Sequence, residues 1–238
     1  REGRIDSRVH VKVARQRLYA ATTTPSSALL LDTTPEYLVQ SKSVPLRVSC
    51  ICPWTKIIML VRNPLDRLQA HFDVAISQGW KDSMEAWIAQ DWEQLKAAGI
   101  NETTTTALDP LQQQEAWGQY QAMVNSDAPL GKGIYSMALR DWWNVLRRFG
   151  IPMLVLKYED WKGNSSDQVL HQAARFLELP PLPAGSSSSR QSASSKMKKE
   201  RRELQMDEET IRMVKKLYAP FNRQLCQDLG WGEGDCWF

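Results

Sequence analysis

Three short apolar runs punctuate the chain, and longer segments with helical periodicity lie between and after them. The runs cover residues 27–32, 56–61 and 152–158. Each is rich in aliphatic residues and ends at polar or turn-forming residues, which is typical of strands buried on both faces. The alternation predicts an α/β fold. Its expected form is a three-layer structure in which helices flank a central parallel sheet.

Capping residues mark the expected helix ends. Asn63 followed by Pro64 predicts a helix start, because Asn caps the first turn and Pro suits the first helical position. Asp82 with Glu85 reads as a variant capping box for a second helix. A third helix should end at Gly150.

The C-terminal third continues this pattern. Ser165 predicts the start of a fourth helix, and Asp207 the start of a long helix that runs through Tyr218. A further short helix is expected after Pro220, with its end at Gly230.

The chain has 238 residues, which predicts a single domain over 1–238. Residues 180–200 are rich in Pro, Ser and basic residues and should form a flexible loop within it. A charged fraction of 24% with 10 Trp excludes a disordered chain. No apolar stretch approaches the roughly 20 residues of a membrane helix. Because the chain begins at Arg1, we expect the domain to be incomplete at its N-terminus.

The net charge of the chain excludes few classes of function. The net charge of +3 does not favour a general nucleic-acid binder, so no nucleic-acid partner is expected. One segment is strongly basic, however, with five Lys or Arg within residues 196–202. It is either a solvated helix start or loop, or an anion site.

The cysteines do not suggest a metal centre. Cys50 and Cys52 lack the two-residue spacer of a zinc or redox pair, and no second pair completes a site, so no metal is expected. Cys226 and Cys236 could form a disulfide around the C-terminal turn. Asn101 and Asn164 each begin an N-glycosylation sequon.

The strongest local signal lies where the second apolar run meets its helix. The first turn of a helix offers free N–H groups and a positive dipole end, and both favour anions. Arg62 at the end of the strand and Arg67 one turn into the helix add fixed positive charge. A phosphate-type site is expected here, with local pairing of both arginines to Asp66 as the alternative. Thr34, after the first apolar run, is either a helix cap or a hydroxyl donor in the same cleft.

Several segments, in this order, resemble sulfotransferases that use 3′-phosphoadenosine 5′-phosphosulfate. The similarity is greatest to Golgi carbohydrate sulfotransferases of the heparan sulfate type. The segments that carry it are residues 32–37, 56–67, 133–142, 154–160, 176–179 and 217–225. The resemblance implies a P-loop-like fold and the phosphosulfate as donor, with no metal.

The resemblance also implies roles for individual residues. Arg62, with Arg67, would hold the 3′-phosphate of the donor. A late basic loop of the family would fall near Lys198, Lys199 and Arg201, and one or more of these would contact the donor. Thr34 and Tyr37 would lie on the acceptor side. The serine that the family places eight residues after Arg62 is replaced by Ala70, which removes one hydroxyl donor.

The family's residues that bind the 5′-phosphosulfate end of the donor are mostly missing from the chain. The family's Lys-x-Gly-Thr phosphosulfate loop has no counterpart in the chain, and the lysine of the Lys-Thr-Pro segment falls on Thr33. Sulfuryl transfer needs a base for the acceptor hydroxyl. In heparan-type members a Glu about thirty residues before the Lys-Thr-Pro segment is the base, so the resemblance implies this role for Glu2, thirty residues before Asp32. His10 and His71 are other titratable groups.

These observations predict an enzyme that transfers a sulfuryl group to a hydroxyl or amine of a glycan. The tryptophans of the middle of the chain would include acceptor-side surface. The resemblance places the protein in the Golgi lumen, with membrane contact only through an upstream anchor. A non-catalytic glycan-binding or scaffold relative is the alternative. A P-loop kinase fits poorly, because no Gly-x-x-x-x-Gly-Lys-Ser/Thr loop is present.

Overall fold

The computed structural model describes residues 31–34, 36–80, 82–124, 128–162, 166–181 and 206–238. The chain separates into two units, 1–37 and 38–238, and each is described by itself. The single domain expected over 1–238 therefore stays a prediction. Residues 31 and 32 are not in a strand, and the rest of the predicted strand 27–32 lies outside the described residues. The same holds for most of the expected loop 180–200.

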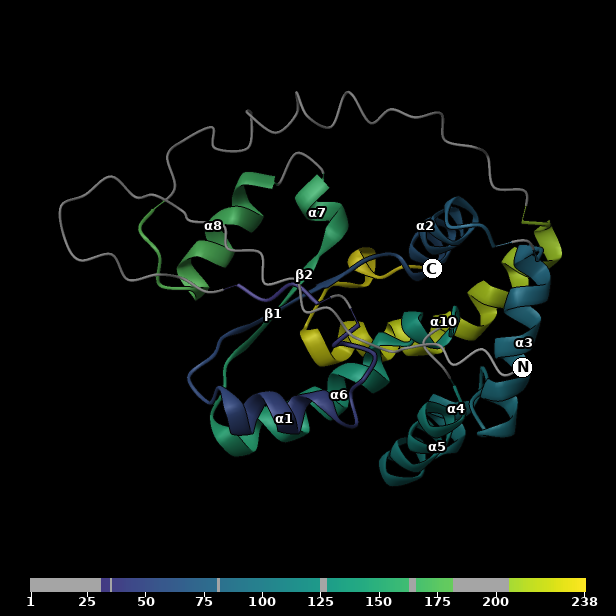
Figure 1. Cartoon of the computed structure of the whole chain (residues 1–238), viewed down its shortest axis with the longest axis horizontal. Coiled ribbons are helices and arrows are strands. Elements are labelled where there is room, and N and C mark those ends of the chain that lie inside the picture. Colours follow the sequence, from purple (N-terminus) through teal and green to yellow (C-terminus); the bar gives the residue numbers. More distant parts are fainter. Residues whose placement is uncertain (1–30, 35, 81, 125–127, 163–165, 182–205) are drawn as a thin grey trace, which may run out of the picture. The chain divides into compact units, whose positions relative to one another are not determined.

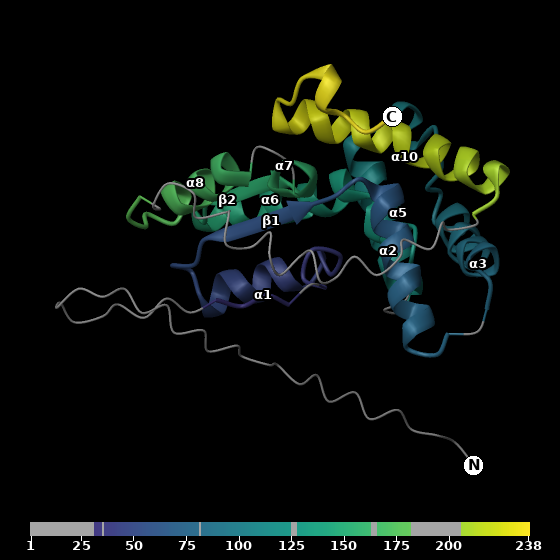
Figure 2. The ribbon, with the colours of Figure 1, turned by 90° about the horizontal axis from the view of Figure 1, so that it is seen from above.

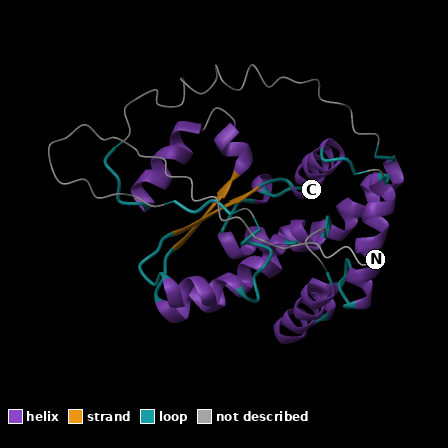
Figure 3. Cartoon of the chain, viewed as in Figure 1, coloured by secondary structure: helices purple, strands orange, loops and turns teal. Residues whose placement is uncertain are grey.

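Two of the predicted strands form the sheet of the second unit. Strand β1 (Ile57–Val61) pairs in parallel with β2 (Met153–Lys157), and Val61 stands opposite Lys157. Figure 3 shows both strands, in orange, among the helices. The parallel pair and its flanking helices confirm the predicted α/β class. In the described part of the chain the sheet has two strands.

Helices account for most of the remaining described residues (Figure 1). Their bounds are α1 (Val44–Ile51), α2 (Pro64–Ser77), α3 (Met84–Ala97), α4 (Thr104–Ala107), α5 (Pro110–Met123), α6 (Tyr135–Phe149), α7 (Tyr158–Lys162), α8 (Ser166–Phe176) and α10 (Glu208–Leu229). Two 3₁₀ turns, η1 (Gly131–Gly133) and η3 (Glu233–Asp235), complete the set. Helix α6 contacts both α1 and α10, which lie on different sides of the strand layer in Figure 2. None of the described helices is long and apolar enough to cross a membrane.

Two of the predicted helix boundaries are wrong. The N-cap of α3 is Ser83, whose hydroxyl accepts a hydrogen bond from Ala86 N, and not Asp82. The helices expected on either side of Pro220 are one continuous helix, α10. A proline inside a helix costs about 3 kcal/mol. Here the buried apolar face of α10 continues across it, with Leu217 before and Phe221 after the proline, and that burial offsets the cost.

A buried carboxylate ties α3 to the turn that precedes α6. Asp91 is only 2% exposed and accepts hydrogen bonds from Tyr120 Oη (2.7 Å), Leu130 N (2.6 Å) and Gly131 N (3.1 Å). A Cβ at Gly131 would collide with the Tyr120 ring, so only glycine allows this approach. Burial outweighs these donors and raises the pKa of Asp91 above its ordinary value of 3.8.

We expect Asp91→Ala to lower the free energy of unfolding by at least about 3 kcal/mol, because three buried donors lose their acceptor. The folded-state pKa of Asp91 is raised, so its contribution is complete below 3.8 and declines as the pH rises through the folded-state value. Urea titrations at about pH 4.5 and pH 7 should therefore give the larger difference between wild type and variant at the lower pH. An equal or smaller difference there would contradict this assignment.

Candidate functional site

The parallel pairing brings two turns together at the carboxyl end of the sheet. Arg62 and Asn63 follow β1, while Tyr158 and Glu159 follow β2. Glu159 Oε1 accepts a hydrogen bond from Asn63 N at 2.7 Å. The guanidinium of Arg62 lies over the Tyr158 ring, 4.9 Å from its centroid, in a cation–π contact. Ligands of open parallel sheets bind at this end of the strands.

The first turn of α2 is capped by its own residues. Asn63 Oδ1 accepts from Leu65 N at 2.9 Å and from Asp66 N at 3.4 Å. Arg67 N donates to Asn63 O at 2.8 Å, and Pro64 has no N–H. The sequence prediction of free N–H groups in this turn was therefore wrong, since the predicted cap Asn63 is the residue that occupies them. The positive charge at this end of the sheet is the Arg62 guanidinium together with the N-terminal end of the helix dipole, and the Glu159 carboxylate lies beside it.

A buried tyrosine supports the same turn from the start of α6. The Tyr135 hydroxyl interacts with the backbone N–H of Arg62, and its side chain is 5% exposed. Burial raises the pKa of Tyr135, while the nearby charges of Arg67 and Arg62 oppose that rise. Glu159 Oε2 is buried with no hydrogen-bond partner among the described residues. Side chains from α6 and α7 thus face two successive N–H groups of the turn.

Arg67 points away from the turn. Its Nη2 donates to Pro129 O, and its Nη1 lies 3.3 Å from His71 Nδ1. No ion pair joins Arg62 or Arg67 to Asp66 among the described residues, so the alternative of local pairing is not seen. The structure separates the two arginines: Arg62 lies at the sheet end, and Arg67 links α2 to the turn before α6.

The predicted acceptor-side residues lie in the first unit. Asp32 Oδ1 accepts from Thr34 N (3.1 Å) and Thr34 Oγ1 (2.8 Å), and its Oδ2 accepts from Tyr37 Oη (2.9 Å). Asp32 therefore organises this segment as a compact turn. Contact of Thr34 and Tyr37 with an acceptor stays a prediction.

Other predicted site residues lie outside the described residues. They are Glu2, His10, Asn164, Lys198, Lys199 and Arg201. Of the sequons, Asn101 is described: its Oδ1 accepts from Thr103 N at 2.9 Å and from Thr103 Oγ1 at 2.7 Å. Among the described residues, no group of three or more His, Cys, Asp or Glu side chains could hold a metal.

Lys157, the last residue of β2, gave no signal in the sequence. Its Nζ donates to Asp235 O at 2.6 Å and lies 5.3 Å from the Trp231 ring and 5.9 Å from the Trp237 ring. A disulfide between Cys226 and Cys236, the pairing that the sequence allowed, closes the segment that carries Trp231 and Asp235. The C-terminal segment therefore encloses the lysine at the carboxyl end of β2.

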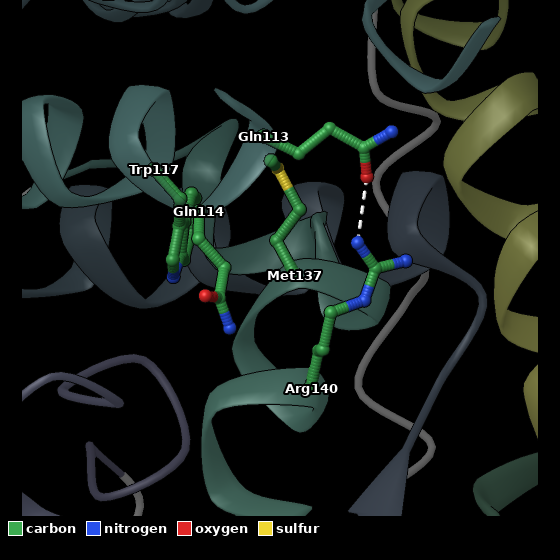
Figure 4. Close-up of a pocket in the computed structure, with 5 residues that line it drawn as sticks. All are labelled: Gln113, Gln114, Trp117, Met137 and Arg140. Atoms are coloured by element: carbon green, nitrogen blue, oxygen red, sulfur yellow. Dashed lines mark hydrogen bonds between the residues drawn. The ribbon is translucent and has the colours of Figure 1, made fainter. Parts of the chain in front are cut away.

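A concavity beside α6 can be set aside as a ligand site. Gln113, Gln114, Trp117, Met137 and Arg140 line it, and Figure 4 shows these five side chains. Arg140 Nη1 donates to Gln113 Oε1 at 2.6 Å across it. No space for a water molecule remains, so these side chains pack against one another.

Comparisons with known proteins identify the family of the chain and a structure of similar fold. Residues 41–225 match the sequence model of a family described as the sulfotransferase domain. A crystal structure of a sulfotransferase from Alicyclobacillus acidocaldarius is similar in fold, with a TM-score of 0.55 and 16% identity. The match covers 84% of this chain and 64% of the bacterial chain, so this chain spans under two thirds of that protein. A search of curated proteins found no match.

Substitution of Glu159 tests how the Arg62–Asn63 turn is held. Glu159→Ala removes the acceptor of a part-buried N–H, which costs about 1–3 kcal/mol, so the Asn63 amide should exchange with solvent roughly 5- to 150-fold faster. Glu159→Gln keeps an acceptor oxygen and should retain most of the protection. Amide exchange measured by NMR checks both. Equal exchange in wild type and Glu159→Ala would show that this bond does not hold the turn.

Proposed function

The chain belongs to the sulfotransferase domain family, and from this we propose that it transfers a sulfuryl group from 3′-phosphoadenosine 5′-phosphosulfate to a carbohydrate hydroxyl or amine. The main structural support for this proposal is the turn at the carboxyl end of β1. It lies inside the family match and presents the guanidinium of Arg62 over Tyr158. We propose that this guanidinium holds the 3′-phosphate of the donor.

The surroundings of Arg62 suit a phosphate. Its planar guanidinium can make two parallel hydrogen bonds to phosphate oxygens, and stacking on Tyr158 limits its rotation before a ligand arrives. The backbone beneath it is fixed through Asn63 and Glu159. Preorganised charge of this kind costs little reorganisation on binding.

Transfer requires that the acceptor oxygen form a bond to sulfur while the bond from sulfur to the 5′-phosphate breaks. The acceptor proton passes to a base, and adenosine 3′,5′-bisphosphate leaves. Glu2 remains our proposed base from sequence spacing. His71 is the weaker choice, because burial, followed by the charges of Lys132 and Arg67, lowers its pKa to about 4. Lys198, Lys199 and Arg201 are proposed as further donor contacts, with Arg67 in a supporting role.

We also propose a Golgi-luminal location, as part of a single-pass membrane protein anchored upstream. The disulfide between Cys226 and Cys236 supports it, since disulfides persist in oxidising compartments. The sequons at Asn101 and Asn164 support it in the same way.

A non-catalytic glycan-binding relative is the second candidate. Ala70 in place of the family's serine and Thr33 in place of its lysine favour it, as does the fully capped first turn of α2. Incubation of the full-length protein with ³⁵S-labelled donor and a glycan panel separates the two. Label in a glycan is expected. Glycan binding without label transfer would favour the second candidate.

Arg62→Ala should weaken binding of adenosine 3′,5′-bisphosphate by about 10- to 100-fold, the effect of losing a charge-assisted bond. Binding of adenosine 5′-phosphate, which lacks the 3′-phosphate, should change little. Titration calorimetry on the full-length protein measures both. Arg147→Ala, which removes an exposed arginine at the end of α6, is the matched control. Unchanged affinity of Arg62→Ala for the bisphosphate would refute the assignment.

A further inference from the structure

A second concave site lies beside the latter half of α2. It has a volume of about 240 Å³ and is lined by His71, Val74, Ala75, Gln78, Trp80 and Trp87. This is smaller than the roughly 300–1,000 Å³ of drug-sized ligand pockets, so the space suits one small ring. It belongs to neither the Arg62 turn nor the filled concavity in Figure 4.

The wall of this site is aromatic. Trp87 packs against His71 at a ring-centroid distance of 4.9 Å, against Trp80 at 5.9 Å and against Phe72 at 6.0 Å. Trp87 is buried, whereas Trp80 remains partly exposed at the site. Rings with an apolar body and a polar N–H suit ligands that present both apolar faces and hydroxyl groups.

The side chains that line the site are uncharged at neutral pH, and the cations Arg67 and Lys132 lie behind His71. His71 is neutral there, because burial and the positive charges of Lys132 and Arg67 lower its pKa to about 4. With Nδ1 accepting from Arg67, its proton resides on Nε2. The Gln78 amide both donates and accepts. The indole N–H groups of Trp80 and Trp87 are buried without an acceptor among the described residues, so these two residues offer the site their apolar ring surface rather than a donor.

We propose that this site binds a sugar ring of the acceptor glycan, an assignment that rests on the proposed function. The neutral amide of Gln78 and the imidazole of His71 match hydroxyls, which donate and accept, and the aromatic wall suits the apolar face of a sugar ring. The site also lies on the helix that begins at the Arg62 turn. His71 is seven residues into α2 from Pro64, about 10 Å along the axis, so an acceptor sugar here would lie beside the proposed donor site and not within it.

Two variants test the assignment from opposite directions. Ala75→Phe should fill the site without disturbing its aromatic wall, and Trp80→Ala should remove part of that wall. Trp54→Ala is the matched control, because Trp54 is 79% exposed and lies outside the site. Calorimetric titration of the full-length proteins would use neutral, N-acetylated and uronic-acid-containing tetrasaccharides. Adenosine 3′,5′-bisphosphate, titrated in parallel, reports donor binding and correct folding.

We expect at least one tetrasaccharide to bind the wild type, with about tenfold or greater weakening in Ala75→Phe and Trp80→Ala. Bisphosphate affinity should stay unchanged, and Trp54→Ala should match the wild type. Equal glycan affinity in wild type and Ala75→Phe would overturn the sugar site and leave the donor site standing. Absence of glycan binding with intact bisphosphate binding would do the same. Loss of both kinds of binding from the wild type would instead refute the proposed function.

Discussion

The hydrogen bond from Asn63 N to Glu159 Oε1 fastens two turns that lie 96 residues apart. It forms because β1 and β2 run in parallel and their last residues, Val61 and Lys157, stand opposite one another. Asn63 is also the N-cap of α2, so the bond that fixes its backbone fixes the start of that helix. Arg62 lies between the last residue of β1 and Asn63. The hydrogen bond from Asn63 N to Glu159 therefore fixes the backbone from which the Arg62 side chain projects.

Two buried acids elsewhere in the second unit also accept hydrogen bonds from segments that are distant in sequence. Asp91 joins α3 to the turn before α6, and Asp141 on α6 accepts from Ser41 Oγ (2.8 Å) and Lys42 Nζ (2.9 Å) ahead of α1. Each acid binds donors from a distant segment, which satisfies buried polar groups and sets where connecting turns lie. Apolar packing brings the helices together, and these carboxylates fix the turns between them.

The sequence predicted those features of the fold that depend on interactions between neighbouring residues. The two aliphatic strands, the Asn63 cap and the end of α6 at Gly150 each depend on a few neighbouring residues, and the structure confirms them. The continuity of α10 through Pro220 depends instead on tertiary burial, which no local rule contains. The roles of Glu159 and Lys157 were missed for a related reason, since their partners are distant in sequence. The position of Arg62 at the sheet end was predicted because it follows a strand and precedes a capped helix, and its role in binding stays a prediction, whereas the direction of Arg67 required the fold.

We propose that the turn after β1 holds the 3′-phosphate of the sulfuryl donor. A crystal structure of the full-length protein with adenosine 3′,5′-bisphosphate tests it most directly. We expect 3′-phosphate oxygens within about 3 Å of the Arg62 guanidinium, with the bond from Asn63 N to Glu159 intact. A bisphosphate bound elsewhere, with Arg62 contacting only Tyr158, would contradict it.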